Sequence, residues 1–271
     1  MEEFLRRSQA TPVSLSVSFS ESTRGNARDV AGMISQHLYH IRNLKIDTGL
    51  LKDVASILLS LREAAPALET VELDNWPEVV RNMSMRSSSL PRDLLRCTAP
   101  RLHSLKIQEF YLPWSSLVFS TLVELKISGL FLDHADPALP AEDLRQFFGA
   151  LSRMPALESL VLKAGLPSLG TASQRTCFPF VTLPNLRWLF LRDDVLKCAI
   201  VLKHLVLPPT AKQAVYGFCT SDDHNGDRSE IILPWLRSHI AALPRIHVLD
   251  FTGLQDDFNV VAYGASVEDP F

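Results

Sequence analysis

A short apolar phrase recurs along the chain and constrains its fold more than any other feature. Residues 66–73 read PALETVEL and residues 155–162 read PALESLVL, so the two octapeptides agree at five of eight positions. Both follow the pattern apolar-x-x-apolar-x-apolar, where x is any residue. The alternation at its end has the period of a β-strand. We therefore predict a series of short strands of one kind.

The same pattern occurs eight times in all. The copies are IRNLKI (41–46), LETVEL (68–73), LHSLKI (102–107), LVELKI (122–127), LESLVL (157–162), LRWLFL (186–191), LKHLVL (202–207) and IHVLDF (246–251). A further, degenerate strand is predicted at 13–19, which reads VSLSVSF. Between the copies, apolar residues with helical spacing predict helices within 26–38, 50–61, 140–154 and 232–243.

Strands that alternate with helices at this spacing indicate an α/β fold built from repeats. The copies are separated by 16 to 44 residues, an irregular version of the spacing in leucine-rich repeats. We expect a leucine-rich-repeat-like solenoid, in which irregular units of strand plus helix form a curved, mostly parallel sheet. The alternative is a doubly wound α/β domain, although its strands are usually runs of Val and Ile.

The whole chain, 1–271, is expected to form one such domain. Residues 208–245 are interpreted as a long insertion with a helix, and residues 252–271 as a C-terminal tail or cap. A proline precedes four of the predicted strands, at Pro66, Pro100, Pro155 and Pro184. Because proline interrupts a helix and favours extended backbone before it, we expect each proline to end the preceding helix.

Charge and cysteine content exclude several classes of protein. The net charge of −3 gives no basic balance that would favour nucleic acid or an anionic membrane. No apolar run reaches the 18 residues of a membrane span. The four cysteines are scattered and form no C-x-x-C pair, which is typical of reduced thiols. We expect a monomeric cytoplasmic or nuclear protein.

Motifs for catalysis or for metal binding are missing from the sequence. It contains no G-x-S-x-G, no phosphate-binding G-x-x-x-x-G-K-[ST] and no H-E-x-x-H. DDHNGD at 222–227 resembles a calcium loop, but aligning Gly226 with the turn glycine places Ile232 where a bidentate Glu is required. We therefore predict no catalytic, cofactor-binding or metal-binding residues, and a protein that is not an enzyme.

Several stretches, taken in order, resemble one family. They are FLRRSQATPVSLSVSF, HLYHIRNLKI, APRLHSLKI, FSTLVELKISGL, LSRMPALESLVLKAGLP, LPNLRWLFLRDD, CAIVLKHLVLPP and ILPWLRSHI. This set resembles the leucine-rich portion of F-box-like proteins of mushroom-forming (basidiomycete-type) fungi. An F-box of about 40–50 residues usually precedes the repeats in that family, a size typical of a small module. We expect the F-box itself to be absent, because MEEFLRR at positions 1–7 already belongs to what resembles the first repeat.

The resemblance implies a protein–protein interaction module. It would correspond to the substrate-recognition half of an F-box ubiquitin-ligase subunit, and the partner would then be a substrate protein of that ligase. The alternative function, from another class, is a small-molecule-binding or enzymatic domain with a pocket under a loop that covers the sheet. That alternative requires polar groups with perturbed pKa values that converge on one pocket.

The x positions of the phrase should face away from the core, on the concave side of the sheet. In the first four copies these residues are polar and of mixed charge, whereas later copies place large or apolar residues there. The predicted partner-binding residues are Val161, Lys163, Trp188, Phe190, Arg192, His204 and Val206. Two interpretations stay open: Trp188 and Phe190 anchor a partner, or a later segment of the chain covers them.

Overall fold

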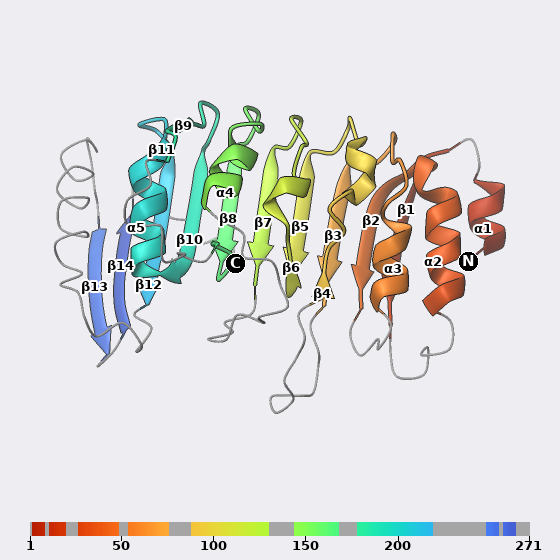
Figure 1. Ribbon diagram of the computed structural model, residues 1–271, viewed down its shortest axis with the longest axis horizontal. Helices are drawn as coiled ribbons and strands as arrows, with labels where there is room; N and C mark the ends of the chain where they lie inside the picture. Colours follow the sequence, from red (N-terminus) through yellow and green to blue (C-terminus); the bar gives the residue numbers. More distant parts are fainter. Residues whose placement is uncertain are drawn as a thin grey trace. The chain divides into compact units, whose positions relative to one another are not determined.

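The computed structural model describes residues 2–8, 11–19, 27–48, 54–75, 88–129, 144–167, 178–218, 248–254 and 257–263. Two compact units are present, one made of Met1–Leu130 and Ala135–Pro140, the other of Phe131–His134 and Ala141–Phe271. Each unit has its own parallel strands and its own helices (Figure 1). The predicted α/β class with a parallel sheet is confirmed, since eight strands pair in parallel.

In the described part of the first unit, the longest run of parallel strands has the spatial order β1-β2-β3-β5-β7, which follows the sequence. The helices and main strands of this unit are α1 (Glu2–Arg7), β1 (Val13–Ser18), α2 (Ala27–His37), β2 (Ile41–Asp47), α3 (Val54–Ser60), β3 (Thr70–Asp74), β5 (Ser104–Gln108) and β7 (Glu124–Ser128). Helices α2 and α3 lie side by side in front of the first strands in Figure 1. The predicted helices within 26–38 and 50–61 are thus present.

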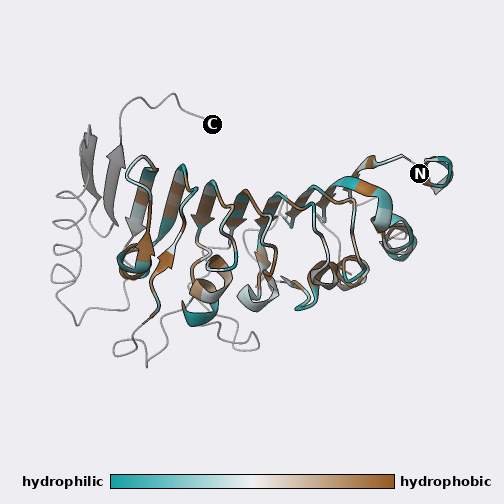
Figure 2. Cartoon of the chain, turned by 90° about the horizontal axis from the view of Figure 1, so that it is seen from above, coloured by the Kyte–Doolittle hydropathy of each residue, from teal (hydrophilic) through white to brown (hydrophobic). Residues whose placement is uncertain are grey.

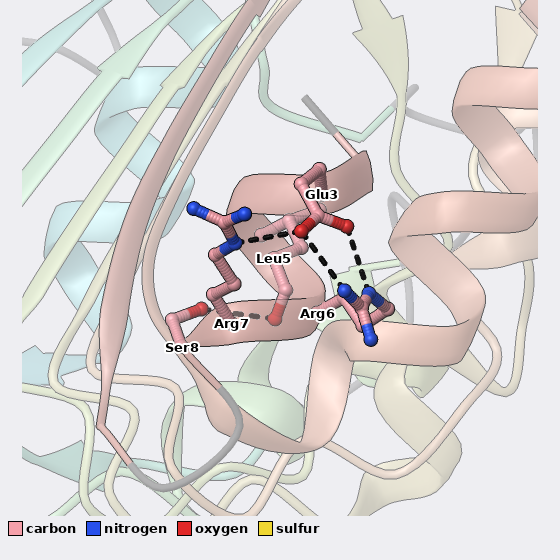
Figure 3. A network of polar contacts seen from close by, with 5 residues as sticks. All are labelled: Glu3, Leu5, Arg6, Arg7 and Ser8. Carbon is pink, nitrogen blue, oxygen red and sulfur yellow. Dashed lines mark hydrogen bonds and ion pairs between the residues drawn. The ribbon is translucent and has the colours of Figure 1, made fainter.

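Short elements complete the first unit. They are the 3-10 helices η2 (Leu38–His40), η3 (Leu94–Cys97) and η4 (Trp114–Ser116) and the two-residue strands β4 (Ser88–Ser89) and β6 (Phe110–Tyr111), which pair in parallel. Helix α1 is held by local contacts, because Glu3 accepts hydrogen bonds from Arg6 and Arg7 at 2.6–2.9 Å (Figure 3). These pairs are exposed, so they contribute little stability. Leu5, which is fully buried, contributes more.

The longest run of parallel strands in the described part of the second unit has the order β8-β10-β12. The elements of this unit are α4 (Leu144–Leu151), β8 (Ser159–Lys163), β9 (Val181–Thr182), β10 (Trp188–Asp194), α5 (Val195–His204), β11 (Leu205–Val206), β12 (Lys212–Phe218), β13 (Val248–Leu254) and β14 (Asp257–Tyr263). Helix α5 contacts β10 and β12. Gly217 permits this approach, since a Cβ atom there would lie 2.8 Å from the Val195 side chain.

A four-residue turn precedes the strand in five copies of the phrase. In each turn the N–H of the first leucine of the copy donates to a carbonyl three residues earlier, as from Leu68 to Ala65 at 3.2 Å. Equivalent bonds join Leu102 to Ala99, Leu122 to Phe119, Leu157 to Met154 and Leu186 to Leu183. In four of these turns proline is the second residue, the position that its fixed φ favours. The prolines therefore begin a turn into the strand, whereas helices α3 and α4 end earlier, at Ser60 and Leu151.

Inward-facing residues of the phrase form continuous buried rows. In the first unit Leu44, Val71, Leu105 and Leu125 are aligned across neighbouring strands, and none is more than 2 % exposed. In the second unit Leu160 is aligned with Leu189, and both are fully buried. The strands carry hydrophilic and hydrophobic residues together, as alternation requires (Figure 2). These rows form the core that the sequence predicted.

The prediction that all eight copies form strands of the parallel sheet is wrong for two of them. The segment 202–207 continues helix α5 through His204, and only Leu205–Val206 form a strand, which pairs with β9 outside the main sheet. Asp194 explains the helix, because its Oδ1 accepts the N–H groups of Leu196 and Lys197 as an N-cap. The copy at 246–251 forms β13, which pairs antiparallel with β14.

Strand β12 takes the place that the sequence assigned to the segment 202–207. It pairs in parallel with β10 and lies within 208–245, the range interpreted as an insertion. Strand β14 lies in the predicted tail, 252–271, and contacts β12. The predicted helix at 232–243 and the DDHNGD segment lie outside the described residues.

Candidate functional site

Strands β8, β10 and β12 present one set of side chains on the side opposite the buried leucines. Leu189 and Leu191 of β10 are fully buried, so alternation turns Trp188, Phe190 and Arg192 to the other face. The neighbouring strands align with them residue by residue. We call this surface the aromatic face, and it consists of Ser159, Val161, Lys163, Trp188, Phe190, Arg192, Lys212, Ala214 and Tyr216.

The structure brings five of the seven predicted site residues together on the aromatic face. Phe190 is aligned with Val161, and Arg192 is aligned with Lys163. The Nζ atom of Lys163 lies 5.2 Å from the centroid of the Phe190 ring, a cation–π distance. Trp188 begins the same strand. These residues therefore share one surface, as the sequence predicted.

Sequence reasoning missed the residues that β12 contributes to the aromatic face, above all Tyr216 and Lys212, along with the small Ala214. Tyr216 is aligned with Arg192, and its ring centroid lies 5.2 Å from that of Phe190. Lys212 is aligned with Trp188. Both belong to β12, which has no copy of the phrase. The alternation in KQAVYGF at 212–218 was the available signal, but the segment was assigned to an insertion.

The aromatic side chains are partly covered. Trp188, Phe190 and Tyr216 are half-buried, while Arg192 and Lys212 are exposed. Ala214 is 2 % exposed although it lies on this face. The aromatic residues thus lie between the two extremes that the sequence left open, neither fully exposed anchors nor members of a closed second core.

His204 and Val206 lie on a different surface from the one predicted. Because α5 extends through His204, this residue contacts the rings of Phe148, Phe178 and Phe180, with centroids 5.3–5.6 Å away. Burial lowers the pKa of His204, and the positive charge of Lys203 lowers it further. Val206 lies on β11 and is 46 % exposed. The prediction that these two residues join the aromatic face is therefore wrong.

The corresponding surface of the first unit is polar, and we call it the polar face. It consists of Ser14, Ser16, Ser18, Asn43, Lys45, Asp47, Thr70, Glu72, Asp74, Ser104, Lys106, Gln108, Glu124, Lys126 and Ser128. Neighbouring strands are joined there by side-chain pairs. Asn43 donates to Ser14 and accepts from Thr70, both at 2.8 Å.

Charged residues of the polar face also pair with one another. Lys45 lies 2.6 Å from Glu72, and this ion pair raises the pKa of Lys45. Glu124 accepts a hydrogen bond from Ser104 at 2.7 Å and lies 3.3 Å from Lys106. Cation and carboxylate therefore meet within the chain on this face.

Two buried carboxyl groups have raised pKa values, and each belongs to a different unit. Burial raises the pKa of Glu109 to about 7, with a smaller contribution from the charge of Asp74. Its Oε2 has no hydrogen-bond partner among the described residues, and its backbone has a φ of 61°. Glu109 directly follows β5, and its N–H extends the ladder to Ser128 at 2.7 Å.

Asp193 is the buried carboxyl group of the second unit. It accepts the N–H groups of Leu166 and Asp194 at 2.9 and 2.8 Å, and Lys197 lies 3.3 Å away. Burial raises its pKa, although Lys197 and the backbone donors oppose this effect. Asp193 thereby joins the segment after β8 to the end of β10. This anchor fixes the strand that carries Trp188 and Phe190.

The described residues contain no group of three His, Cys, Asp or Glu side chains placed to hold a metal ion. Cys198 is buried, and burial raises the pKa of its thiol, which disfavours a reactive thiolate. In the part of the chain that the structure describes, no helix is both long enough and apolar enough to cross a membrane. No protein-family model matches the chain, and no curated protein is significantly similar to it.

Proposed function

We propose that the chain is a protein–protein interaction module of the leucine-rich-repeat type, without enzymatic activity. Support for a repeat architecture comes from the proline-containing turn and the aligned leucines, which recur with the same hydrogen bond in both units. Such repeats commonly present a sheet surface to another protein. The sequence resemblance extends this proposal to substrate recognition for a ubiquitin ligase in the cytoplasm or nucleus.

The observation that carries the proposal is the aromatic face. Aromatic and arginine side chains dominate the binding energy of protein interfaces, and Trp188, Phe190, Tyr216 and Arg192 occupy adjacent positions here. Their ordered backbone costs nothing further on binding, since β10 is hydrogen-bonded on both sides. A protein surface is therefore the ligand that this arrangement suits best.

A capture experiment tests this function. The wild-type chain and the double variant Trp188→Ala/Phe190→Ala are immobilised and exposed to an extract of the source organism, and the retained proteins are identified by mass spectrometry. We expect a protein that the wild type retains and the double variant loses, while the melting temperature of the variant stays within a few degrees. Lys126→Ala on the polar face is the matched control and should retain that protein.

Two results would contradict the proposal. Equal retention by the wild type and the double variant would exclude the aromatic face as the binding site. A large fall in the melting temperature of the double variant would show that the two rings belong to a second apolar layer, so that their burial serves stability.

A further inference from the structure

Strand β1 forms one end of the row of parallel strands in the first unit (Figure 1), and among the described strands it pairs with β2 alone. The N–H of Phe19, directly after β1, donates to the carbonyl of Asp47 at 3.0 Å, so the backbone of Phe19 faces β2. Successive residues of a parallel strand direct their N–H and C=O groups to opposite sides. Ser14, Ser16 and Ser18 therefore direct theirs away from β2.

We call the outward-directed backbone groups of Ser14, Ser16 and Ser18 the serine edge. All three serines are exposed. Proteins commonly protect an edge strand from pairing by charged residues, by proline or by a bulge. Residues 13–18 read VSLSVS, without a charged residue or proline, and the register shift of β1 falls between Val13 and Ser14, before the serine edge. The serine edge therefore keeps the regular geometry of a strand that can accept another strand.

The apolar side of β1 is buried less completely than that of its neighbour. Val13, Leu15 and Val17 remain 7–8 % exposed, whereas Leu44 and Ile46 of β2 are 1 % exposed. An added strand would remove this remaining apolar area from water. In the second unit, by contrast, the last strand of the parallel row, β12, contacts β14. Backbone and apolar row thus both point to the outer side of β1 as a place where a further strand fits.

We infer that the serine edge pairs with the serine edge of a second copy of this chain, in antiparallel orientation. With a two-fold axis at Ser16, this residue faces its own copy, and Ser14 faces Ser18 of the other chain. All three residues then exchange both of their backbone hydrogen bonds across the junction. The side chains that face each other are serines, which are small and uncharged and bring no repulsion. This self-complementarity favours a second copy over an unrelated strand.

The pairing uses a different surface from the aromatic face, so it goes beyond the proposed function and replaces the expectation of a monomer. Two short edge strands bury less than the roughly 1,000 Å² that is typical of a stable interface, so association should require a high protein concentration. Each dimer would carry two aromatic faces, which strengthens binding to a partner that displays its own site twice.

Sedimentation velocity and amide hydrogen exchange of the full chain, each measured over a wide range of protein concentration, test the pairing. We expect the average mass to rise from that of one chain towards that of two. The amide protons of Ser14, Ser16 and Ser18 should exchange more slowly as the concentration rises. Those of Leu15 and Val17, which face β2, should exchange at an unchanged rate.

A charge swap at Ser16 tests the register. Because this side chain faces its own copy, Ser16→Lys alone and Ser16→Glu alone should each weaken self-association about fivefold by like-charge repulsion. An equal mixture of the two variants should associate at least as tightly as the wild type, since opposite charges then meet. Gln108→Lys adds a positive charge on β5, which already pairs with β3 and β7, and should leave self-association unchanged. Ser16 is exposed, so its variants should melt close to the wild-type temperature.

Three results would overturn the inference. The first is an average mass that does not change with concentration. The second is slow exchange of the three serine amides already at the lowest concentration, which would show that another part of the same chain covers the serine edge. The third is a mixture of the two Ser16 variants that associates no more tightly than either variant alone.

The double variant Trp188→Ala/Phe190→Ala separates this inference from the proposed function. It should self-associate as the wild type does, while losing the protein that the aromatic face captures. If it no longer self-associates, the chains meet through the aromatic face, and the assignment to β1 is wrong. Self-association with the expected charge swap, but without any captured protein that depends on the two rings, would support this inference and overturn only the proposed function.

Discussion

Most strands of the polar face in the first unit and of the aromatic face in the second carry the same phrase in the same register, whereas β1 and β12 carry no full copy of it. In both, the middle leucines align in a buried row, and the residues on either side of them point outward. The polar face uses these outward positions for ion pairs such as Lys45 with Glu72. The aromatic face uses them for rings and cations. Core and outer surface are therefore specified by separate residues of one repeated pattern.

The two faces differ in the kind of side chain that neighbouring strands bring together. On the polar face a side chain finds its partner on the next strand of the same chain, as Thr70 does with Asn43. Such contacts satisfy the surface without a ligand and contribute little to stability when exposed. On the aromatic face, half-buried rings leave apolar area at the surface, which is typical of a binding site. The proposed function therefore assigns binding to the aromatic face.

The largest effect on stability should come from the buried rows of leucines, of which each unit has its own. Leu160→Ala should lower the free energy of unfolding by about 2–5 kcal/mol, because it leaves a cavity in a fully buried row. Leu105→Ala, its counterpart in the first unit, should have an effect of similar size. Chemical denaturation measures both. An effect below about 0.5 kcal/mol at either position would show that the inward and outward faces have been exchanged in that unit.

The next effect concerns Glu109, the buried residue that follows β5 in the first unit. Its pKa rises from 4.5 to about 7 on folding, so the folded state holds a proton that the unfolded state releases in this range. Stability should therefore be highest below about pH 4.5 and fall as the pH rises to about 7, by at most about 3 kcal/mol from this group. Glu109→Gln should remove this loss and be more stable than the wild type at alkaline pH.

Unfolding by urea at mildly acidic and mildly alkaline pH measures the effect of Glu109. The control is Glu124→Gln, which alters a half-buried carboxylate that already has partners. If Glu109→Gln retains the pH dependence of the wild type, another group is responsible for it.

A smaller effect is expected at Asp194, the N-cap of α5. Asp194→Ala removes the N-cap of α5 and should lower the free energy of unfolding by about 0.5–2 kcal/mol. Asp194→Asn should restore most of that loss, because Asn also caps helices. Thermal and chemical denaturation compare the three proteins. An alanine variant as stable as the wild type would show that the cap bonds contribute nothing to α5.

The smallest effect should be found on the polar face. Lys45→Ala removes an ion pair with Glu72 in which both side chains are more than 40 % exposed, so it should change the free energy of unfolding by less than about 0.5 kcal/mol. Capture by the aromatic face should also be unaffected. If the free energy of unfolding fell by more than about 1 kcal/mol, the side-chain pairs of the polar face would stabilise the first unit more than exposed ion pairs usually do.

Periodicity predicted most of the strands because a buried row requires apolar residues two positions apart. It failed at LKHLVL (202–207) because this segment begins inside a helix: Leu202 continues the helical spacing of Cys198 and Val201, and all three lie on the buried side of α5. The Asp194 cap decides in favour of the helix, and a cap eight residues before the copy is not part of its pattern. β12 was missed for the opposite reason, since its buried residues include Ala214 and Gly217 and no leucine.

Residues of the candidate site could be predicted only where their strands had been predicted correctly. Trp188 and Phe190 flank a leucine that had to be buried, so their direction followed from alternation alone. Tyr216 depended on a pairing with β10 that only the fold reveals. His204 and Val206 were misplaced together with their strand. Glu109 and Asp193 gave no sequence signal, because the burial that perturbs their pKa values arises from tertiary packing.

The turn that precedes the strands also bears on how the chain finds its fold. Aligned buried residues of adjacent strands are only 20 to 34 residues apart in the first unit, from Leu105 to Leu125 and from Val71 to Leu105. The entropy lost on closing a loop grows with the logarithm of its length, so the longer connection costs only about 0.5 kcal/mol more than the shorter. Longer connections between repeats therefore reduce stability only slightly, as long as each turn delivers its strand in register.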